Sequence, residues 1–242
     1  MESEVGGVIL IKNDGTIDPW GLKMMNSSRI DLLPPTRENT EEIDGVDGEE
    51  DFGTELDSGD WELICFTPAG MTRSELLDFM SNLAAQLHAL RNQPDMLVWE
   101  SDQNKGLYVR MGTPKEEDLL ELFSVNIPLR YQPIWVSVIE HTSIGSGTLT
   151  NAGTFETPVK ISIRGPVVNP LVTIGGKVLQ YTGTLAAPDL LEIDTDAVTV
   201  KLNGANAQQN FTVDFPKLQA GDTAVVAPGT GTTTFTWRDR WI

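Results

Sequence analysis

The chain has 242 residues, of which 40% are hydrophobic, and its formal net charge is −18. This length predicts two compact domains of roughly 100 to 140 residues each, and the composition excludes collagen-like and low-complexity chains. No apolar run approaches the roughly 20 residues that cross a bilayer, and the N-terminus lacks a signal-peptide pattern. We therefore expect a protein that is made in the cytoplasm and does not bind a membrane.

The charge is distributed unevenly along the chain. Residues 1–140 carry 27 acidic and 10 basic residues, whereas residues 141–242 carry 8 and 7. Between Glu38 and Glu62 there are twelve acidic residues and no Lys or Arg. Because affinity for nucleic acid comes largely from cationic side chains, the sequence argues against specific nucleic-acid binding.

The sequence predicts short strands and loops in the first 66 residues. Val8–Ile11 followed by the turn residues 13–15 predicts a hairpin. After Pro34-Pro35, repeated Asp-Gly and Ser-Gly pairs with few apolar residues predict a long loop that is either mobile or ordered at an interface. A strand is expected at Trp61–Phe66, and in it the single cysteine, Cys65, is expected to be a buried apolar residue.

One helix is predicted from residue 72 onward. Thr72 and Glu75 form a capping box, an apolar stripe follows at helical spacing, and Pro94 is expected to end the helix. The stripe consists of Leu76, Met80, Leu83, Leu87 and Leu90. Its regular spacing favours packing onto a sheet over a cofactor site.

The sheet under this helix is expected to include strands at Met96–Glu100 and Gly106–Met111, joined by a polar hairpin loop over residues 101–105. Residues 114–123 fit either a short acidic helix or the approach to a strand. Two prolines within 127–136 confine that segment to an edge strand or an irregular strand. The N-terminal domain is therefore expected to be α+β.

Beyond residue 143 the pattern changes. We expect Ser143–Gly147 to be a linker, which gives domains at 1–142 and 143–242. Short apolar runs without helical periodicity then predict a β-sandwich of nine strands. The predicted strands are Gly147–Asn151, Val159–Arg164, Leu171–Ile174, Lys177–Thr182, Asp189–Asp194, Ala197–Leu202, Gln209–Val213, Thr223–Ala227 and Thr232–Arg238. Apolar and polar residues alternate over 159–164 and 198–202, and Asn203-Gly204 predicts a type I′ hairpin turn.

Residues suited to catalysis or metal binding are sparse. The chain has two histidines, His88 and His141, for which we expect structural roles, and it has no G-x-S-x-G motif. Three Cys and His residues in total are too few for a structural zinc site. EF-hand registers that start at Asp44 or Asp47 fail, which leaves a solvated acidic loop or an irregular calcium site. We therefore predict no catalytic, cofactor-binding or metal-binding residues and no cofactor.

The C-terminal aromatic residues leave two interpretations open. In an alternating strand Phe235, Trp237 and Trp241 share one face, which fits core or subunit-interface packing as well as a platform for sugars. The sugar-binding patterns of galectins, H-x-N-x-R and W-x-x-E-x-R, are absent. The alternative function that this leaves is a carbohydrate-binding module.

Motifs in both halves, taken in order, resemble the distal tail protein family of long, non-contractile phage tails, the siphophages. The N-terminal ones are Leu33–Arg37, Ile43–Glu49, Phe52-Gly53 and Trp61–Phe66; the C-terminal ones are Asn151–Gly153, Pro158–Gly165, Asn169-Pro170, Leu191–Asp194, Leu202–Gly204, Phe215–Asp222 and Trp237–Trp241. The sequence departs from the family in the stretch that follows Leu33–Arg37, which is unusually acidic. Some basic residues are expected there, and this chain has Glu41, Glu42, Glu49 and Glu50.

The resemblance implies a mainly β fold, with an N-terminal tail-tube-like domain that has one helix and a protruding hairpin, and a C-terminal galectin-like sandwich. It implies a non-enzymatic virion protein that forms a homohexameric ring at the distal end of the tail. The alternative is a cell-wall carbohydrate-binding module of a tail-tip or host-attachment protein. The expected partners are the tail tube protein, the tail-tip hub protein, and the tape measure or receptor-binding protein. On this interpretation some carboxylates between Glu38 and Glu62 face a DNA channel and repel passing phosphates.

Overall fold

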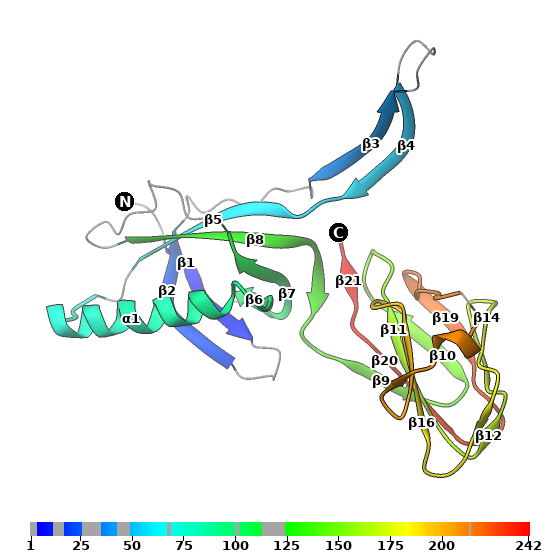
Figure 1. Cartoon of the computed structure of the whole chain (residues 1–242). Coiled ribbons are helices and arrows are strands. Elements are labelled where there is room, and N and C mark those ends of the chain that lie inside the picture. Colours follow the sequence, from blue (N-terminus) through cyan, green and yellow to red (C-terminus); the bar gives the residue numbers. More distant parts are fainter. Residues whose placement is uncertain are drawn as a thin grey trace. The chain divides into compact units, whose positions relative to one another are not determined.

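The computed structural model describes residues 4–11, 17–25, 35–42, 49–66, 69–99, 102–112, 124–212 and 214–242. The chain folds into two compact units, an N-terminal unit of Met1–Trp135 with Ile242 and a C-terminal unit of Val136–Trp241. The described residues are mainly β with one α-helix, as the sequence predicts (Figure 1).

The N-terminal unit is built on a sheet that closes on itself. Its strands follow the order β8-β5-β2-β1-β6-β7, and β7 also pairs with β8. The elements are β1 Glu4–Ile11, β2 Ile17–Met25, β3 Thr36–Glu42, β4 Glu49–Leu56, β5 Gly59–Phe66, α1 Arg73–Ala89, β6 Asp95–Trp99, β7 Asp102–Met111 and β8 Ser124–Ser137. The predicted N-terminal hairpin is confirmed, since β1 and β2 are antiparallel neighbours; its predicted turn lies outside the described residues.

The predicted long loop after Pro35 is wrong for residues 36–42 and 49–56. These residues form β3 and β4, an antiparallel pair that is a separate two-stranded sheet and extends away from the closed sheet (Figure 1). Pro35 accepts a hydrogen bond from the Asp57 N–H (2.8 Å), which closes the base of the hairpin. Cross-strand hydrogen bonding satisfies a polar backbone without an apolar face, so hydropathy alone does not reveal this hairpin.

Helix α1 follows the local rules that predict it. Thr72 and Glu75 form the capping box, which gives hydrogen-bond acceptors to backbone N–H groups at the start of the helix. The helix ends at Ala89, five residues before Pro94. Its inner face contributes Leu83 and Leu90 to the core, and the partly buried Phe79, Met80 and Leu87 pack against them; Leu76 is half-buried. Most of the stripe is therefore core, as predicted.

Two predictions for the following strands need correction. The polar stretch expected as a loop belongs to β7, which begins at Asp102 directly opposite Trp99. Strand β8 is flanked by β5 and β7 rather than lying at an edge. The buried Pro128 is tolerated there because its carbonyl accepts the Gly112 N–H at 2.9 Å, a bond that needs no N–H from proline. Residues 114–123 lie outside the described part of the chain.

The C-terminal unit is a sandwich of two sheets, ordered β10-β19-β13-β14 and β18-β17-β16-β11-β20-β9, with a small pair β12–β15. Its elements are β9 His141–Ile144, β10 Gly147–Asn151, β11 Val159–Arg164, β12 Val167–Val168, β13 Leu171–Ile174, β14 Lys177–Gln180, β15 Thr184–Leu185, β16 Leu190–Asp194, β17 Thr199–Leu202, β18 Ala205–Asn206, η1 Gln208–Asn210, β19 Gly221–Val226, β20 Thr232–Trp237 and β21 Arg240–Trp241.

The sandwich core confirms the alternation over residues 159–164. Val159, Ile161 and Ile163 are buried in one apolar cluster together with residues from both sheets, including Phe235 and Leu149. The intervening Lys160 and Arg164 are exposed. The turn at Asn203-Gly204 is also confirmed, because both residues have positive φ, 50° and 81°.

Three C-terminal predictions are wrong. Ser143–Gly147 is not a linker, because it contains the end of β9, a turn and the start of β10. The segment from Gln209 begins in a 3-10 turn rather than a strand. Val198 does not alternate inward: its φ is +53° and its side chain is 48% exposed, because it lies in the turn before β17.

Candidate functional site

Cys65 and His88 lie in surroundings that do not favour catalysis. Cys65 lies in β5 with no exposed surface, and burial raises the pKa of its thiol to about 12. A thiol with such a pKa is protonated near neutral pH and is a poor nucleophile. His88 lies exposed in the last turn of α1. Both residues are thus structural or surface residues.

His141 is part of a partly buried polar cluster at the end of β20. Its Nε2 lies 2.9 Å from Asp239 Oδ2, and its ring stacks on Trp237 with centroids 5.4 Å apart. Asp239 is 5% exposed, and its Oδ1 accepts the Ala152 N–H at 3.1 Å. No hydroxyl or thiol among the described residues completes this pair into a nucleophilic site. The cluster therefore serves to hold the C-terminal segment.

The other residues of the C-terminal motif have the same role. The Arg238 guanidinium donates to the carbonyls of Ser137 (3.0 Å) and Val138. The carbonyl of Arg240 accepts the Phe155 N–H at 3.0 Å. A Cβ atom on Gly153 would lie 1.8 Å from that carbonyl oxygen, so only glycine fits. The motifs at 151–153 and 237–241 are thus in contact, and each constrains which residues fit at the other.

The aromatic residues of β20 belong to the core. Phe235 has no exposed surface, Trp237 is 8% exposed, and the Trp237 indole N–H donates to the carbonyl of Thr150 (3.0 Å). Trp241 is half-buried in β21. Core packing is thus confirmed for the first two residues, which removes them as a sugar platform.

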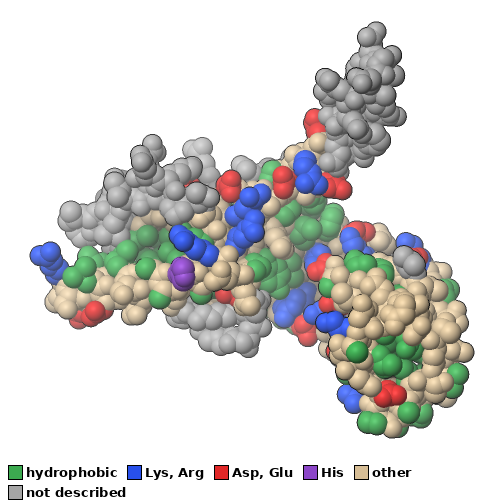
Figure 2. Space-filling view, viewed as in Figure 1, with side chains coloured by type: hydrophobic (Ala, Val, Ile, Leu, Met, Phe, Trp, Pro, Cys, Tyr) green, Lys and Arg blue, Asp and Glu red, His purple; other side chains and the backbone are tan. Residues whose placement is uncertain are grey.

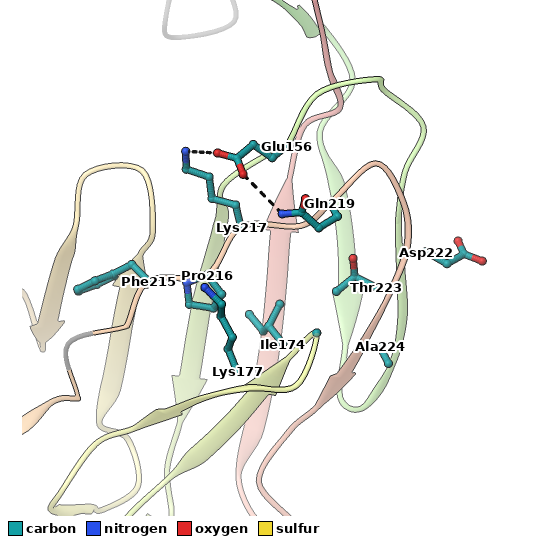
Figure 3. A pocket seen from close by; sticks show the side chains of 11 residues that line it. Glu156, Ile174, Lys177, Phe215, Pro216, Lys217, Gln219, Asp222, Thr223 and Ala224 are labelled. Carbon is teal, nitrogen blue, oxygen red and sulfur yellow. Dashed lines mark hydrogen bonds and ion pairs between the residues drawn. The ribbon is translucent and has the colours of Figure 1, made fainter. Parts of the chain in front are cut away.

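A shallow groove of about 420 Å³ lies on the C-terminal unit (Figure 3). Ile174, Phe215 and Pro216 contribute apolar surface, and charged residues surround them. Lys217 donates to Glu156 at 2.5 Å; Asp222 accepts the Thr150 hydroxyl at 2.6 Å. These polar groups are therefore already engaged within the chain. Carbohydrate binding by this unit stays a prediction, and glycan-array binding by the protein would test it.

The Lys217–Glu156 pair makes a testable contribution to the pH dependence of stability. The Lys217 hydrogen bond lowers the pKa of Glu156 below its usual 4.5, so the stabilisation is complete above pH 4.5 and is lost as the pH falls through the lowered pKa. Because both side chains are over a third exposed, we expect Glu156→Gln to cost only about 0.2–1 kcal/mol at pH 7. Urea unfolding at pH 7 and at a pH well below 4.5 should show a smaller difference between the variant and the wild type at the lower pH. An equal difference at both pH values would contradict the assignment.

An arginine cluster lies on the N-terminal unit. Arg91, Arg110 and Arg130 line one cavity of about 260 Å³ together with Tyr108 and Tyr131. Figure 2 shows Lys and Arg side chains at several separate places on the visible face of this unit. The three arginines come from the loop after α1, from β7 and from β8. No local sequence signal links them, so sequence analysis missed the cluster.

Two further findings concern the described residues alone. No group of three His, Cys, Asp or Glu residues within them could hold a metal ion. The one helix of this part of the chain is not long and apolar enough to cross a membrane.

Comparison with known proteins gives matches at the levels of family and fold. Residues 152–241 match the model of the siphovirus-type tail component, C-terminal domain. The Dit protein (gp 19.1) of phage SPP1, whose structure is presented as a paradigm of the hub adsorption apparatus in phages infecting Gram-positive bacteria, superposes with a TM-score of 0.71. That match has 16% sequence identity and covers 98% of this chain and 99% of the SPP1 chain.

Chains of the phage p2 baseplate in its activated conformation are also similar. The calcium form gives a TM-score of 0.50 at 9% identity, covering 96% of this chain and 97% of that one. The strontium form gives 0.52 at 8% identity, covering 96% of each chain. No curated protein matches this sequence significantly. Residues 152–241 are therefore similar to the siphovirus-type tail component domain, and the chain as a whole shares its fold with SPP1 Dit.

Proposed function

We propose that this protein is the distal tail protein of a siphophage, located at the distal end of the virion tail. There it forms a hexameric ring that joins the tail tube to the tail-tip hub or baseplate and leaves a channel for DNA. The observation that carries the proposal is the likeness to SPP1 Dit over both units, 98% of this chain against 99% of that one. The family match of residues 152–241 supports the same role.

The protein works through interfaces and not through catalysis. The chemical surroundings of its rare reactive groups support this: Cys65 is buried with a raised pKa, and His141 is engaged with Asp239. The partners of these interfaces are further copies of the chain, the tail tube protein and the hub protein. The tape measure protein or a receptor-binding protein would complete the set.

The acidic excess of the N-terminal half suits a conduit for DNA. Residues 1–140 carry 27 acidic and 10 basic residues. Carboxylates close to passing phosphates repel them by roughly 1–4 kcal/mol per close charge pair, depending on the local dielectric. A channel lined in this way does not retain the DNA that moves through it.

The ring is tested with the purified protein, alone and mixed with the tail tube and hub proteins of the same phage. Native mass spectrometry should give a mass six times that of the chain, and negative-stain electron microscopy should show six-fold rings with a central opening. A protein that remains monomeric at high concentration, and forms no ring with these partners, would contradict the proposal.

A further inference from the structure

The arginine cluster lines its cavity with hydrogen-bond donors and without a carboxylate. Arg91 and Arg110 are exposed, and Arg130 is half-buried. The other lining residues are neutral, and none of the described residues around the cavity is Asp or Glu. An anion that enters the cavity therefore meets only neutral and positively charged side chains.

The three guanidinium groups have no partner in the described part of the chain. No hydrogen bond or ion pair joins them to a described residue, and the Arg130 Nε is buried without an acceptor. A buried donor without an acceptor destabilises the fold, and more so when the group is charged. An oxyanion in the cavity would supply the missing acceptor.

Strand pairing holds two of these arginines together as like charges. Strands β7 and β8 are antiparallel, because the successive pairs that link them around the closed sheet are all antiparallel. The Gly112 N–H donates to the Pro128 carbonyl at 2.9 Å. In a regular antiparallel ladder this register sets Arg110 opposite Arg130. Like charges directly opposite one another destabilise a strand pair, and an anion between the two groups would neutralise them.

The carboxylate that faces the cluster across a strand pair does not neutralise it. Asp60 of β5 lies opposite Arg130, but among the described residues no ion pair joins the two side chains. Other arginines of the chain do pair with carboxylates: Arg37 with Glu55, Arg238 with Glu140 and Arg240 with Asp196. The cluster thus keeps its charge available for a group from outside the chain.

The surroundings of the cluster favour a carboxylate of a protein over the phosphates of DNA. Tight binding of a duplex requires cationic side chains along several successive phosphates, whereas residues 1–140 carry 27 acidic and 10 basic residues. A cavity of about 260 Å³ has room for an acidic side chain but not for a stretch of duplex. The planar guanidinium group also matches a carboxylate through two parallel hydrogen bonds.

We propose that the cavity lined by Arg91, Arg110 and Arg130 binds a carboxylate of an acidic segment of a partner protein. Arg110 and Arg130 hold this carboxylate from β7 and β8, and Arg91 contacts it from the loop after α1. The site goes beyond the proposed function because it assigns one surface of the chain to a partner of defined chemistry. It lies within a single copy, so its binding can be measured whether or not the ring forms.

The test measures binding of a synthetic peptide of six glutamates to the purified full-length protein by isothermal titration calorimetry at several salt concentrations. A peptide of six glutamines is the uncharged comparison. The wild type should bind the glutamate peptide and not the glutamine peptide. Arg110→Gln should weaken binding at least about ten-fold, because hydrogen bonds between charged groups are lost. Wild-type protein that binds the two peptides equally would overturn the proposal.

The matched control is Arg73→Gln, which makes the same change of charge at an exposed arginine outside the cavity. Arg73 begins α1, whereas Arg91 follows the other end of that helix. Because salt screens charges at such a separation, the control should bind the glutamate peptide within about two-fold of the wild type. Equal weakening by Arg73→Gln and Arg110→Gln would mean that net charge and not the cavity determines binding, and would overturn the proposal.

Thermal unfolding separates binding from a structural role of Arg110. Without peptide, Arg110→Gln should be at least as stable as the wild type, because one of two opposed like charges is removed. The glutamate peptide should raise the unfolding midpoint of the wild type more than that of the variant, since a ligand stabilises the state that binds it. A variant that unfolds earlier than the wild type, or that binds the peptide as tightly, would overturn the proposal.

Inorganic phosphate and a short DNA duplex separate the two sources of oxyanions. If either binds more tightly than the glutamate peptide, and this binding is lost in Arg110→Gln, the site is assigned to phosphates and the proposal is overturned. A protein that forms no ring with its tube and hub proteins, but binds the glutamate peptide through Arg110, would contradict the proposed function and support this site.

Discussion

Phe235→Ala is expected to destabilise the C-terminal unit by about 3–5 kcal/mol. Phe235 has no exposed surface and lies in the apolar cluster between the two sheets. Removing its ring takes away apolar burial and leaves a cavity that the surrounding β-branched residues can fill only in part. Urea unfolding should show an earlier transition for this unit and an unchanged one for the N-terminal unit.

The control for this variant is Val226→Ala. Val226 lies in the other sheet of the same sandwich, but its side chain is 54% exposed, so we expect a change within about 0.5 kcal/mol. A Phe235→Ala variant as stable as this control would mean that the core described for the sandwich is wrong.

Gly153→Ala should cost about 3 kcal/mol or more, although it adds a single methyl group. The new Cβ would lie 1.8 Å from the Arg240 carbonyl oxygen and 2.6 Å from its carbonyl carbon. These are backbone atoms, so the clash cannot be relieved by rotating a side chain, and overpacking of this kind costs about 1–3 kcal/mol or more. The displaced segment would also lose the Phe155–Arg240 hydrogen bond. Thermal unfolding measures the loss.

Gly147→Ala is its matched control in the same region of the chain. A Cβ at Gly147 meets no atom within 4 Å, and its φ is not in the left-handed region. We expect this variant to unfold within about 0.5 kcal/mol of the wild type. Equal effects at the two glycines would show that the close approach of residues 153 and 240 is not what makes glycine necessary.

The C-terminal motif has a structural role. The polar and aromatic residues at 237–241 hold the chain end against Ala152 and Ser137 rather than presenting a ligand site. Among the described residues, the surfaces that remain as candidates are the groove of the C-terminal unit and the arginine cluster of the N-terminal unit. The last of these could not be predicted from the sequence, because its members lie 19 and 20 residues apart along the chain, at 91, 110 and 130, and meet only through strand pairing.

The sequence by itself determined the features that depend on neighbours a few residues apart. The capping box at Thr72, the helical stripe, the alternation at 159–163 and the turn at Asn203-Gly204 are all set by local backbone preferences and by periodic apolar side chains. The tertiary structure alone decided which strands pair. It paired residues 36–42 with residues 49–56, placed β8 between two neighbours, turned Val198 outward and brought the three arginines together. Strand pairing joins residues that are distant in the chain, and the hydrogen bonds and packing that fix it leave no periodic trace in one segment.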